Sequence, residues 1–215
     1  MTVESELQFM YRGEGPPLVP VELAKLTLAG SERTQLVDTY YDTDDLRLRR
    51  AGCTLRIRQA VNRTRPRLTW KGSAVRRRGA KEREETEVPL EHLPRDGAEL
   101  AEKLVELGLW DLVRKAMKRR KGGRLESIGE VRNDRSTHSY VRGLHRLELT
   151  WDRLDYPVGP PETRLEVEVK SRPARRFLKA VQAELDAIYG GALVSPPRGK
   201  VKELCDRLYP DVAGK

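Results

Sequence analysis

Long apolar runs, cysteines and aromatic side chains are all scarce in this sequence of 215 residues. No apolar stretch approaches the roughly 20 residues of a membrane-spanning helix, and the first residues alternate with acids instead of forming a signal peptide. The two cysteines, Cys53 and Cys205, lie far apart and fit no zinc-ligand spacing, so we expect reduced thiols in a core. We therefore expect a cytoplasmic protein with no membrane partner.

Basic residues outnumber acidic ones, with 42 Lys and Arg against 33 Asp and Glu, which gives a net charge of +9 and a pI near 9.7. Such a surplus favours an anionic partner, which could be nucleic acid, an acidic surface or a phosphorylated small molecule. Hydrophobic residues make up 38% of the chain, enough for a sizeable core. Because the sequence shows no internal repeat and no low-complexity linker, we expect a single domain over 1–215.

The clearest local signal is a strict alternation of side-chain type in residues 53–58. One face carries Cys53, Leu55 and Ile57, and the other carries Thr54, Arg56 and Arg58. This period of two predicts a β-strand. Two guanidiniums on one face of a strand can bind one polyanion through forked hydrogen bonds, although a solvated outer face is the commoner explanation of a single charged strand.

Other segments repeat the alternation and sort their charges by strand. Acids are paired at Glu4 and Glu6, Glu85 and Glu87, and Glu166 and Glu168, whereas bases are paired at Arg56 and Arg58 and at Arg67 and Lys71. Like charges on one face repel, so such pairs persist more readily when something between the strands neutralises them. Mg²⁺ is typically held by carboxylates plus substrate phosphates, and phosphates bind arginine and lysine. The pattern therefore predicts a curled sheet with a charged interior that holds a metal–polyphosphate complex.

Apolar spacing and turn residues predict the remaining elements. We expect helices at 19–28, 96–107, 109–117, 173–189 and 200–208, strands at 3–9, 36–41, 67–71, 83–89, 128–140, 147–151 and 164–170, and a basic loop at 72–80. Asp96 is suited to cap the second of these helices, and the register of the 128–140 strand is undetermined. The helices at 96–107 and 173–189 are expected to cover the apolar outer face of the sheet.

The order of several short motifs is more specific than any one of them. An acidic first strand is followed by YYDT at 40–43 and LRLRRAGCTLRIR at 46–58. Then come Trp70-Lys71, Glu85 with Glu87, NDRS with Arg135, Asp152, Glu166-Val167-Glu168 and Lys200. This order resembles that of the CYTH family, the triphosphate tunnel metalloenzymes, from Glu4 to about Leu208. One departure is Gln8, which stands where lysine closes the E-x-E-x-K signature of that family.

The resemblance implies an α+β fold: an eight-stranded antiparallel β-barrel, or tunnel, with a charged interior and helices packed outside. It also implies metal-dependent hydrolysis, with Mg²⁺ or Mn²⁺, of inorganic triphosphate, thiamine triphosphate or a nucleoside triphosphate. The implied residues are Glu4, Glu6, Asp152, Glu166 and Glu168 for metal, Arg56, Arg58, Lys71, Arg135 and Lys200 for substrate, and Glu85, Glu87 and Lys200 for catalysis. Arg132 would replace Arg135 if the strand register shifts.

Two alternatives stay open from the sequence. A class IV adenylyl cyclase would use the same fold to make cyclic AMP from ATP, and it ranks second because no segment indicates an adenine pocket. A non-catalytic polyphosphate or RNA binding protein would use the basic runs at 76–78 and 118–121. A pure polyanion binder has no reason to place paired acids opposite its bases, so we expect a small-molecule triphosphate rather than nucleic acid, bound by a monomer or homodimer.

Overall fold

The computed structural model describes residues 6–61, 65–73, 75–77, 80–82, 84–117, 124–170, 175–195 and 198–213. Its strands are β1 (Glu6–Tyr11), β2 (Glu22–Leu23), β3 (Leu26–Asp42), β4 (Thr54–Ala60), β5 (Arg67–Lys71), β6 (Val75–Arg77), β7 (Ala80–Glu82), β8 (Glu85–Pro89), β9 (Glu126–Arg142), β10 (His145–Asp155), β11 (Glu162–Val169) and β12 (Leu193–Val194). Its helices are α1 (Arg47–Arg50), α2 (Gly97–Glu106), α3 (Trp110–Ala116), α4 (Arg175–Tyr189), α5 (Lys200–Leu208) and α6 (Pro210–Ala213).

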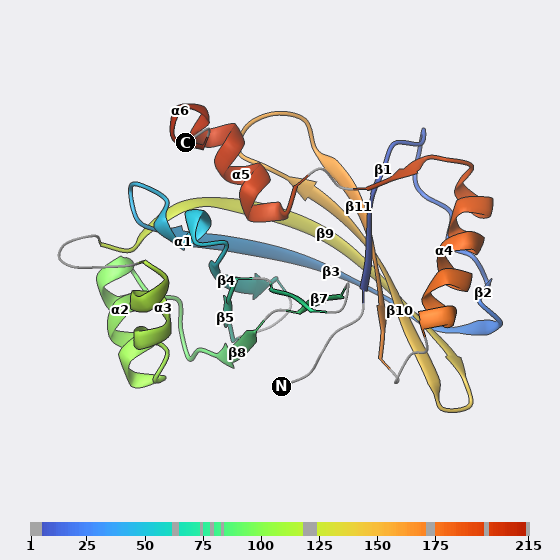
Figure 1. The fold of residues 1–215 in the computed structure, drawn as a ribbon, viewed down its shortest axis with the longest axis horizontal. Coiled ribbons are helices and arrows are strands. Elements are labelled where there is room, and N and C mark those ends of the chain that lie inside the picture. Colours follow the sequence, from blue (N-terminus) through green and yellow to red (C-terminus); the bar gives the residue numbers. More distant parts are fainter. Residues whose placement is uncertain are drawn as a thin grey trace.

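One antiparallel sheet organises the molecule (Figure 1). Its hydrogen-bonded order is β12-β1-β11-β10-β9-β3-β4-β5-β8, with β2 added to β3, and β6 and β7 form a separate hairpin. Within the described residues the sheet has 10 strands and is not closed, because β8 is not hydrogen-bonded to β1. The predicted eight-stranded closed barrel is therefore wrong in strand number and closure, whereas the antiparallel sheet with a few helices is confirmed.

Helices cover the apolar face of this sheet at two places, as Figure 1 shows for α4 at one end and for α2 and α3 at the other. Trp151 and Leu165 pack in one core cluster with Val181 and Leu185 of α4. A second cluster joins Leu55, Ile57, Leu68 and Trp70 to Leu100 and Leu104 of α2 and Val113 of α3. Each fully buried aliphatic side chain contributes about 1.5–3 kcal/mol to folding, so the alternation predicted from sequence decides which face is covered.

Helix α5 packs on a different part of the sheet. Its Leu204 and Cys205 lie in a third core cluster with Tyr40, Val131 and Leu154. These three strand residues point to the same face of the sheet as the charged side chains. Val131 is the cross-strand partner of Asp38, Tyr40 is the partner of Arg56, and Leu154 is two residues after Asp152 on the same strand. Helix α5 therefore covers one end of the charged face.

The predicted helix at 19–28 is wrong. The chain forms β2 there and turns through Ala24 and Lys25, which have φ angles of 50° and 64°, into the long strand β3. Two consecutive positive φ values match the tight turn of a β-hairpin. Residues from Thr27 onward pair with β9, and this long-range ladder overrides the local helical spacing of the apolar residues.

The other predicted helices and strands agree with the structure in kind where the chain is described. The carboxylate of Asp96 accepts hydrogen bonds from the backbone N–H groups of Ala98 and Glu99, so α2 begins where predicted. The basic loop predicted at 72–80 is wrong, because the segment contains β6, and β7 begins at Ala80. The predicted connector before β4 contains α1, and residues 173–174 of the predicted fourth helix lie outside the described residues. None of the helices in the described ranges has the length and apolar character needed to cross a membrane.

Candidate functional site

The strand register brings the charged pairs to one face of the sheet. Cross-strand partners on this face are Glu6 and Glu168, Glu168 and Glu148, Gln8 and Glu166, Asp152 and Arg164, Asp152 and Arg135, Asp38 and Arg58, Tyr40 and Arg56, Arg56 and Thr69, Thr69 and Glu87, and Lys71 and Glu85. The shared facing of the predicted residues follows from this register and from the two-residue period of a strand. Glu4, predicted as a metal ligand, lies outside the described residues.

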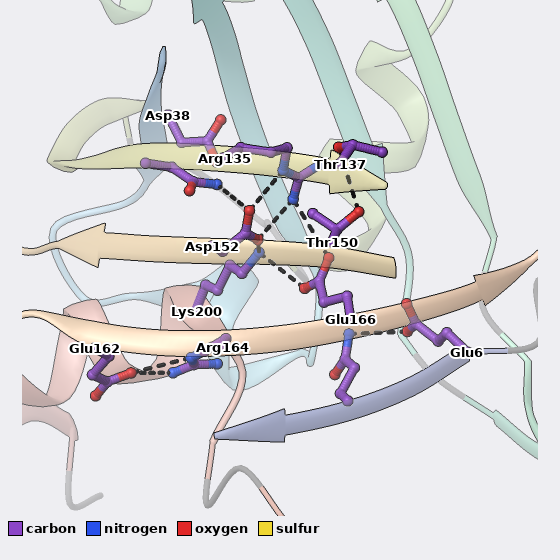
Figure 2. A network of polar contacts seen from close by, with 12 residues as sticks. Glu6, Asp38, Arg135, Thr137, Thr150, Asp152, Glu162, Arg164, Glu166 and Lys200 are labelled. Carbon is purple, nitrogen blue, oxygen red and sulfur yellow. Dashed lines mark hydrogen bonds and ion pairs between the residues drawn. The ribbon is translucent and has the colours of Figure 1, made fainter. Parts of the chain in front are cut away.

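Asp152 is the centre of the first charged cluster on this face (Figure 2). Its side chain is fully buried, and Arg135 donates two hydrogen bonds to it, from Nε to Oδ1 and from a terminal nitrogen to Oδ2, both at 2.7 Å. Lys200 Nζ lies 2.5 Å from Oδ2, and Asn133 Nδ2 donates to Oδ1 at 3.0 Å. Both oxygens of this carboxylate are therefore engaged by donors of the protein itself.

Glu166 shares the two cations with Asp152. Its Oε1 lies 2.9 Å from Lys200 Nζ, and its Oε2 lies 3.5 Å from a guanidinium nitrogen of Arg135. Figure 2 shows the two carboxylates on neighbouring strands, with Lys200 and Arg135 reaching toward both. The four side chains thus form a charge-balanced cluster of two acids and two bases.

The cluster keeps all four groups ionised. Burial alone would raise the pKa of Asp152, but the charges of Lys200 and Arg135 and their hydrogen bonds lower it well below its ordinary value. Burial likewise opposes ionisation of Glu166, but the charges of Lys200 and Arg135 and the hydrogen bond from Lys200 together lower its pKa. Burial would lower the pKa of Lys200, whereas Asp152 and Glu166 raise it. Lys200 is therefore a permanent cation at neutral pH.

Asp38 organises a second cluster around the two arginines of β4. Arg58 donates from Nε to Oδ1 at 2.6 Å and from a terminal nitrogen to Oδ2 at 2.7 Å, and Arg56 reaches Oδ2 at 3.3 Å. Asp38 is only 1% exposed. Its burial opposes ionisation, but the hydrogen bond from Arg58 and the charge of Arg56 lower its pKa. Sequence reasoning missed Asp38, although a lone acid between Leu36 and Tyr40 in a strand pattern is a signal of a buried partner.

The DTDDLRLRR segment has a local reason for its composition. Asp42 is buried, and its Oδ1 accepts from the backbone N–H of Thr43 and of Leu48, while its Oδ2 accepts from that of Arg49. These bonds satisfy donors at the start of α1, which otherwise have no partner within the helix. Asp42 thereby fixes the turn from β3 into β4, and β4 carries Arg56 and Arg58.

An acidic row continues along β1, β11 and β10. Glu6, Glu148 and Glu168 occupy adjacent cross-strand positions, and Lys170 Nζ lies 2.5 Å from Glu168 and 3.2 Å from Glu148. Gln8 donates to Glu6 at 3.1 Å. Carboxylate oxygens are the ligands that Mg²⁺ and Mn²⁺ prefer, so the chemistry of the row fits such an ion. In the part of the chain that the structure describes, no three acidic, histidine or cysteine side chains are arranged to hold a metal.

The predicted residues of β5 and β8 lie at the far edge of the same face. Lys71 Nζ is 2.6 Å from Glu85, and Arg67 forms an ion pair with Glu87. In the hydrogen-bonded order, β9, β3 and β4 stand between β5 and β10. The structure therefore pairs these acids with bases of the neighbouring strand, apart from the Asp152 cluster.

The register of β9 decides between the two candidate arginines. Arg135 is opposite Asp152 and contacts it, whereas Arg132 is opposite Asp155 and exposed. Asn133 belongs to the cluster as well and was not predicted, because an amide side chain in a strand gives no distinctive sequence signal. Its Oδ1 is buried and has no hydrogen-bond partner among the residues that the structure describes.

Comparisons with known proteins agree with the fold. A candidate adenylyl cyclase from Hippeastrum, described as having a dominant triphosphatase activity, has 19% identity and a TM-score of 0.67, with 96% of this chain and 98% of that chain covered. A candidate adenylate cyclase from Vibrio parahaemolyticus has 18% identity and a TM-score of 0.53, with 95% and 99% covered. No curated protein matches. The model of the CYTH domain matches residues 3–195, and the chain therefore belongs to the CYTH family.

Proposed function

We propose that this protein hydrolyses a small triphosphate substrate on the charged face of its sheet, with the help of a divalent metal ion. The observation that carries the proposal is the pair of cation clusters, Arg56 with Arg58 and Arg135 with Lys200, which face the same side as the acidic row. A triphosphate needs several cations along its length and a metal that neutralises charge on the transferred phosphoryl group. The described charged face has cationic side chains for the phosphates and carboxylates for the metal.

The acidic row would hold the metal. Glu6 and Glu168, which are cross-strand partners, are the best placed of the described carboxylates, with Glu4 and Glu166 as their neighbours in sequence. When bound, Mg²⁺ or Mn²⁺ would neutralise phosphate charge and orient the substrate. We assign Asp152 a different role from the metal ligand that the sequence resemblance implied. Its oxygens already accept from Asn133, Arg135 and Lys200, so it holds the two cations in position.

The arginines and Lys200 would bind the phosphates. Arg56 and Arg58 are fixed on Asp38 and present guanidiniums that suit phosphate oxygens. Lys200 and Arg135 both contact Glu166, so an incoming phosphate would replace this carboxylate as their partner with a more highly charged anion. Cations held in place before the substrate arrives need no reorganisation during the reaction. Glu85 and Glu87 would orient the attacking water from the β8 edge.

A turnover panel tests this proposal. Inorganic triphosphate, thiamine triphosphate and ATP are each incubated with Mg²⁺ or Mn²⁺, and phosphate, pyrophosphate and cyclic AMP are measured. Release of phosphate from at least one substrate is the expected result. Cyclic AMP with pyrophosphate as the products from ATP would establish the cyclase instead. Tight binding of polyphosphate or RNA with no turnover would establish a binding protein.

A single substitution tests the acidic row. Glu168→Gln should lower the rate by orders of magnitude, because a metal that bridges carboxylate and phosphate contributes several kcal/mol to transition-state stabilisation. Glu130→Gln is the matched control, since Glu130 is opposite Thr39 and points to the other face of the sheet. Normal turnover of Glu168→Gln with Mg²⁺ would remove this residue from the site.

A further inference from the structure

A ladder of four charged side chains, none assigned above, joins β11 to α5. Arg164 donates from Nε and from a terminal nitrogen to Glu162 Oε2, at 3.1 Å and 2.7 Å. The other oxygen of Glu162 accepts from Arg207 at 2.6 Å, and Arg207 Nε donates to Glu203 at 2.9 Å. The ladder thus links a strand of the charged face to two positions on the helix that begins at Lys200.

Arg164 also contacts the segment just before this helix. One terminal nitrogen donates to the backbone carbonyl oxygen of Arg198 at 2.9 Å, and the other donates to the hydroxyl oxygen of Tyr156 at 3.3 Å. Arg198 precedes Lys200 by two residues. Figure 2 shows Arg164 and Glu162 on the same strand as Glu166, next to the Asp152 cluster. The guanidinium of Arg164 is therefore a direct link between β11 and the start of α5.

Arg207, on α5, contacts the loop between β10 and β11. It donates to the carbonyl oxygens of Val158 and Pro160, at 3.1 Å and 2.8 Å, and lies over the ring of Tyr156 at 4.2 Å. The side chains of Arg164 and Glu162 are 6% and 11% exposed. Such burial removes water as a competing partner, so the geometry of the ladder is more rigid than that of a surface ion pair.

We propose that Arg164 is a positioning residue for Lys200: it holds the Arg198 carbonyl and thereby sets where the Lys200 ammonium lies between Asp152 and Glu166. This inference rests on the phosphate-binding role proposed for Lys200. Arg164 itself is opposite Asp152 on the charged face, but its donors are directed to Glu162, Arg198 and Tyr156. It acts through Lys200 and not by contact with substrate.

A double-mutant cycle tests the coupling. Arg164→Gln removes the fork but keeps a polar side chain, and we expect kcat/KM for triphosphate to fall about 10- to 100-fold, because a misplacement of about 1 Å has effects of this size. In a Lys200→Met background the same change should alter kcat/KM by less than about twofold, because the residue that it positions is gone. Arg164→Lys should be intermediate and takes the place of Arg164→Gln if that variant does not fold. Equal losses in both backgrounds, or a lower melting temperature with unchanged kcat/KM, would overturn the inference.

Arg33→Gln is the matched control, since Arg33 is 75% exposed and pairs only with Asp134 among the described residues. It should change neither kcat/KM nor the coupling. A crystal structure of the Arg164 variant gives a readout without turnover: Lys200 Nζ should leave Asp152 and Glu166. Lys200 unmoved in that structure refutes the positioning role, whereas an inactive wild-type protein refutes the proposed function alone.

Discussion

Replacing Asp152 with asparagine should destabilise the protein strongly while keeping the shape of the side chain. Asp152 is completely buried and accepts hydrogen bonds from Asn133, Arg135 and Lys200. The amide of Asp152→Asn keeps one acceptor oxygen but has no charge. It leaves Arg135 and Lys200 with Glu166 as their nearest anion.

The magnitude follows from this loss of compensation. Breaking a buried ion pair by removing one partner costs about 3–5 kcal/mol, and the remaining charge of Glu166 places this case at the lower end, about 3 kcal/mol. For a chain of this size each kcal/mol corresponds to about 2–4 °C, so we expect the melting temperature to fall by about 6–12 °C. Adding Lys200→Met to Asp152→Asn should recover part of this loss, because one unpaired cation is removed.

Differential scanning calorimetry of wild type, Asp152→Asn, the double variant and a control measures this directly. Asp134→Asn is the control, because Asp134 lies on β9, the strand next to the one that carries Asp152, but pairs with the mostly exposed Arg33. The melting temperature of this control should match wild type. A melting temperature of Asp152→Asn within about 2 °C of wild type would refute the reasoning. A double variant less stable than Asp152→Asn would show that Lys200 stabilises through packing and not through its charge.

Three further results are expected. Folding lowers the pKa values of Asp38, Asp152 and Glu166 below their ordinary values of 3.8 for aspartate and 4.5 for glutamate. The resulting stabilisation is complete above these ordinary values and is lost as the pH falls toward the lowered pKa values of the folded state. The midpoint of urea unfolding should therefore drop between pH 5 and pH 3. Gln8→Lys should lower the KM for triphosphate about two- to fivefold in steady-state kinetics, since one exposed charge contact contributes up to about 1 kcal/mol; an unchanged KM at every metal concentration would count against a substrate contact at this position. Burial raises the pKa of the Cys205 thiol to about 12, so thiol reagents at pH 8 should label it only after denaturation, and labelling of the folded chain would contradict its buried place.

The parts of the fold that sequence predicted depend on local geometry. The alternation in residues 53–58 predicts both a strand and its facing, because successive side chains in a strand point to opposite sides whatever the strand pairs with. The helix at 200–208 was predicted in the same way, from one apolar stripe containing Leu204 and Cys205. These inferences need no knowledge of distant segments.

The parts that sequence could not predict depend on pairing between distant segments. The role of Asp38 requires that it stand opposite Arg58, and that of Asn133 requires the register of β9 against β10. Closure of the sheet would require β8 to pair with β1. In the hydrogen-bonded order of the described strands, β8 is at one end, and β1 is at the other end next to β12. Neither the charge pattern nor the periodicity of the sequence determines whether these two strands pair. The predicted helix at 19–28 failed for the same reason, since a ladder with β9 decides the conformation there.

The departure at Gln8 has a physical explanation in the charge balance of the acidic row. A lysine at this position would stand opposite Glu166, but Glu166 already contacts Lys200 and Arg135. Glu168, further along the row, contacts Lys170. The acids therefore keep cationic partners without a lysine at position 8, and the fold loses little by its absence. Under the proposed function the cost would fall on binding, because Lys200 and Arg135 would be shared between carboxylates and substrate, and a bound metal would carry a larger share of the phosphate charge.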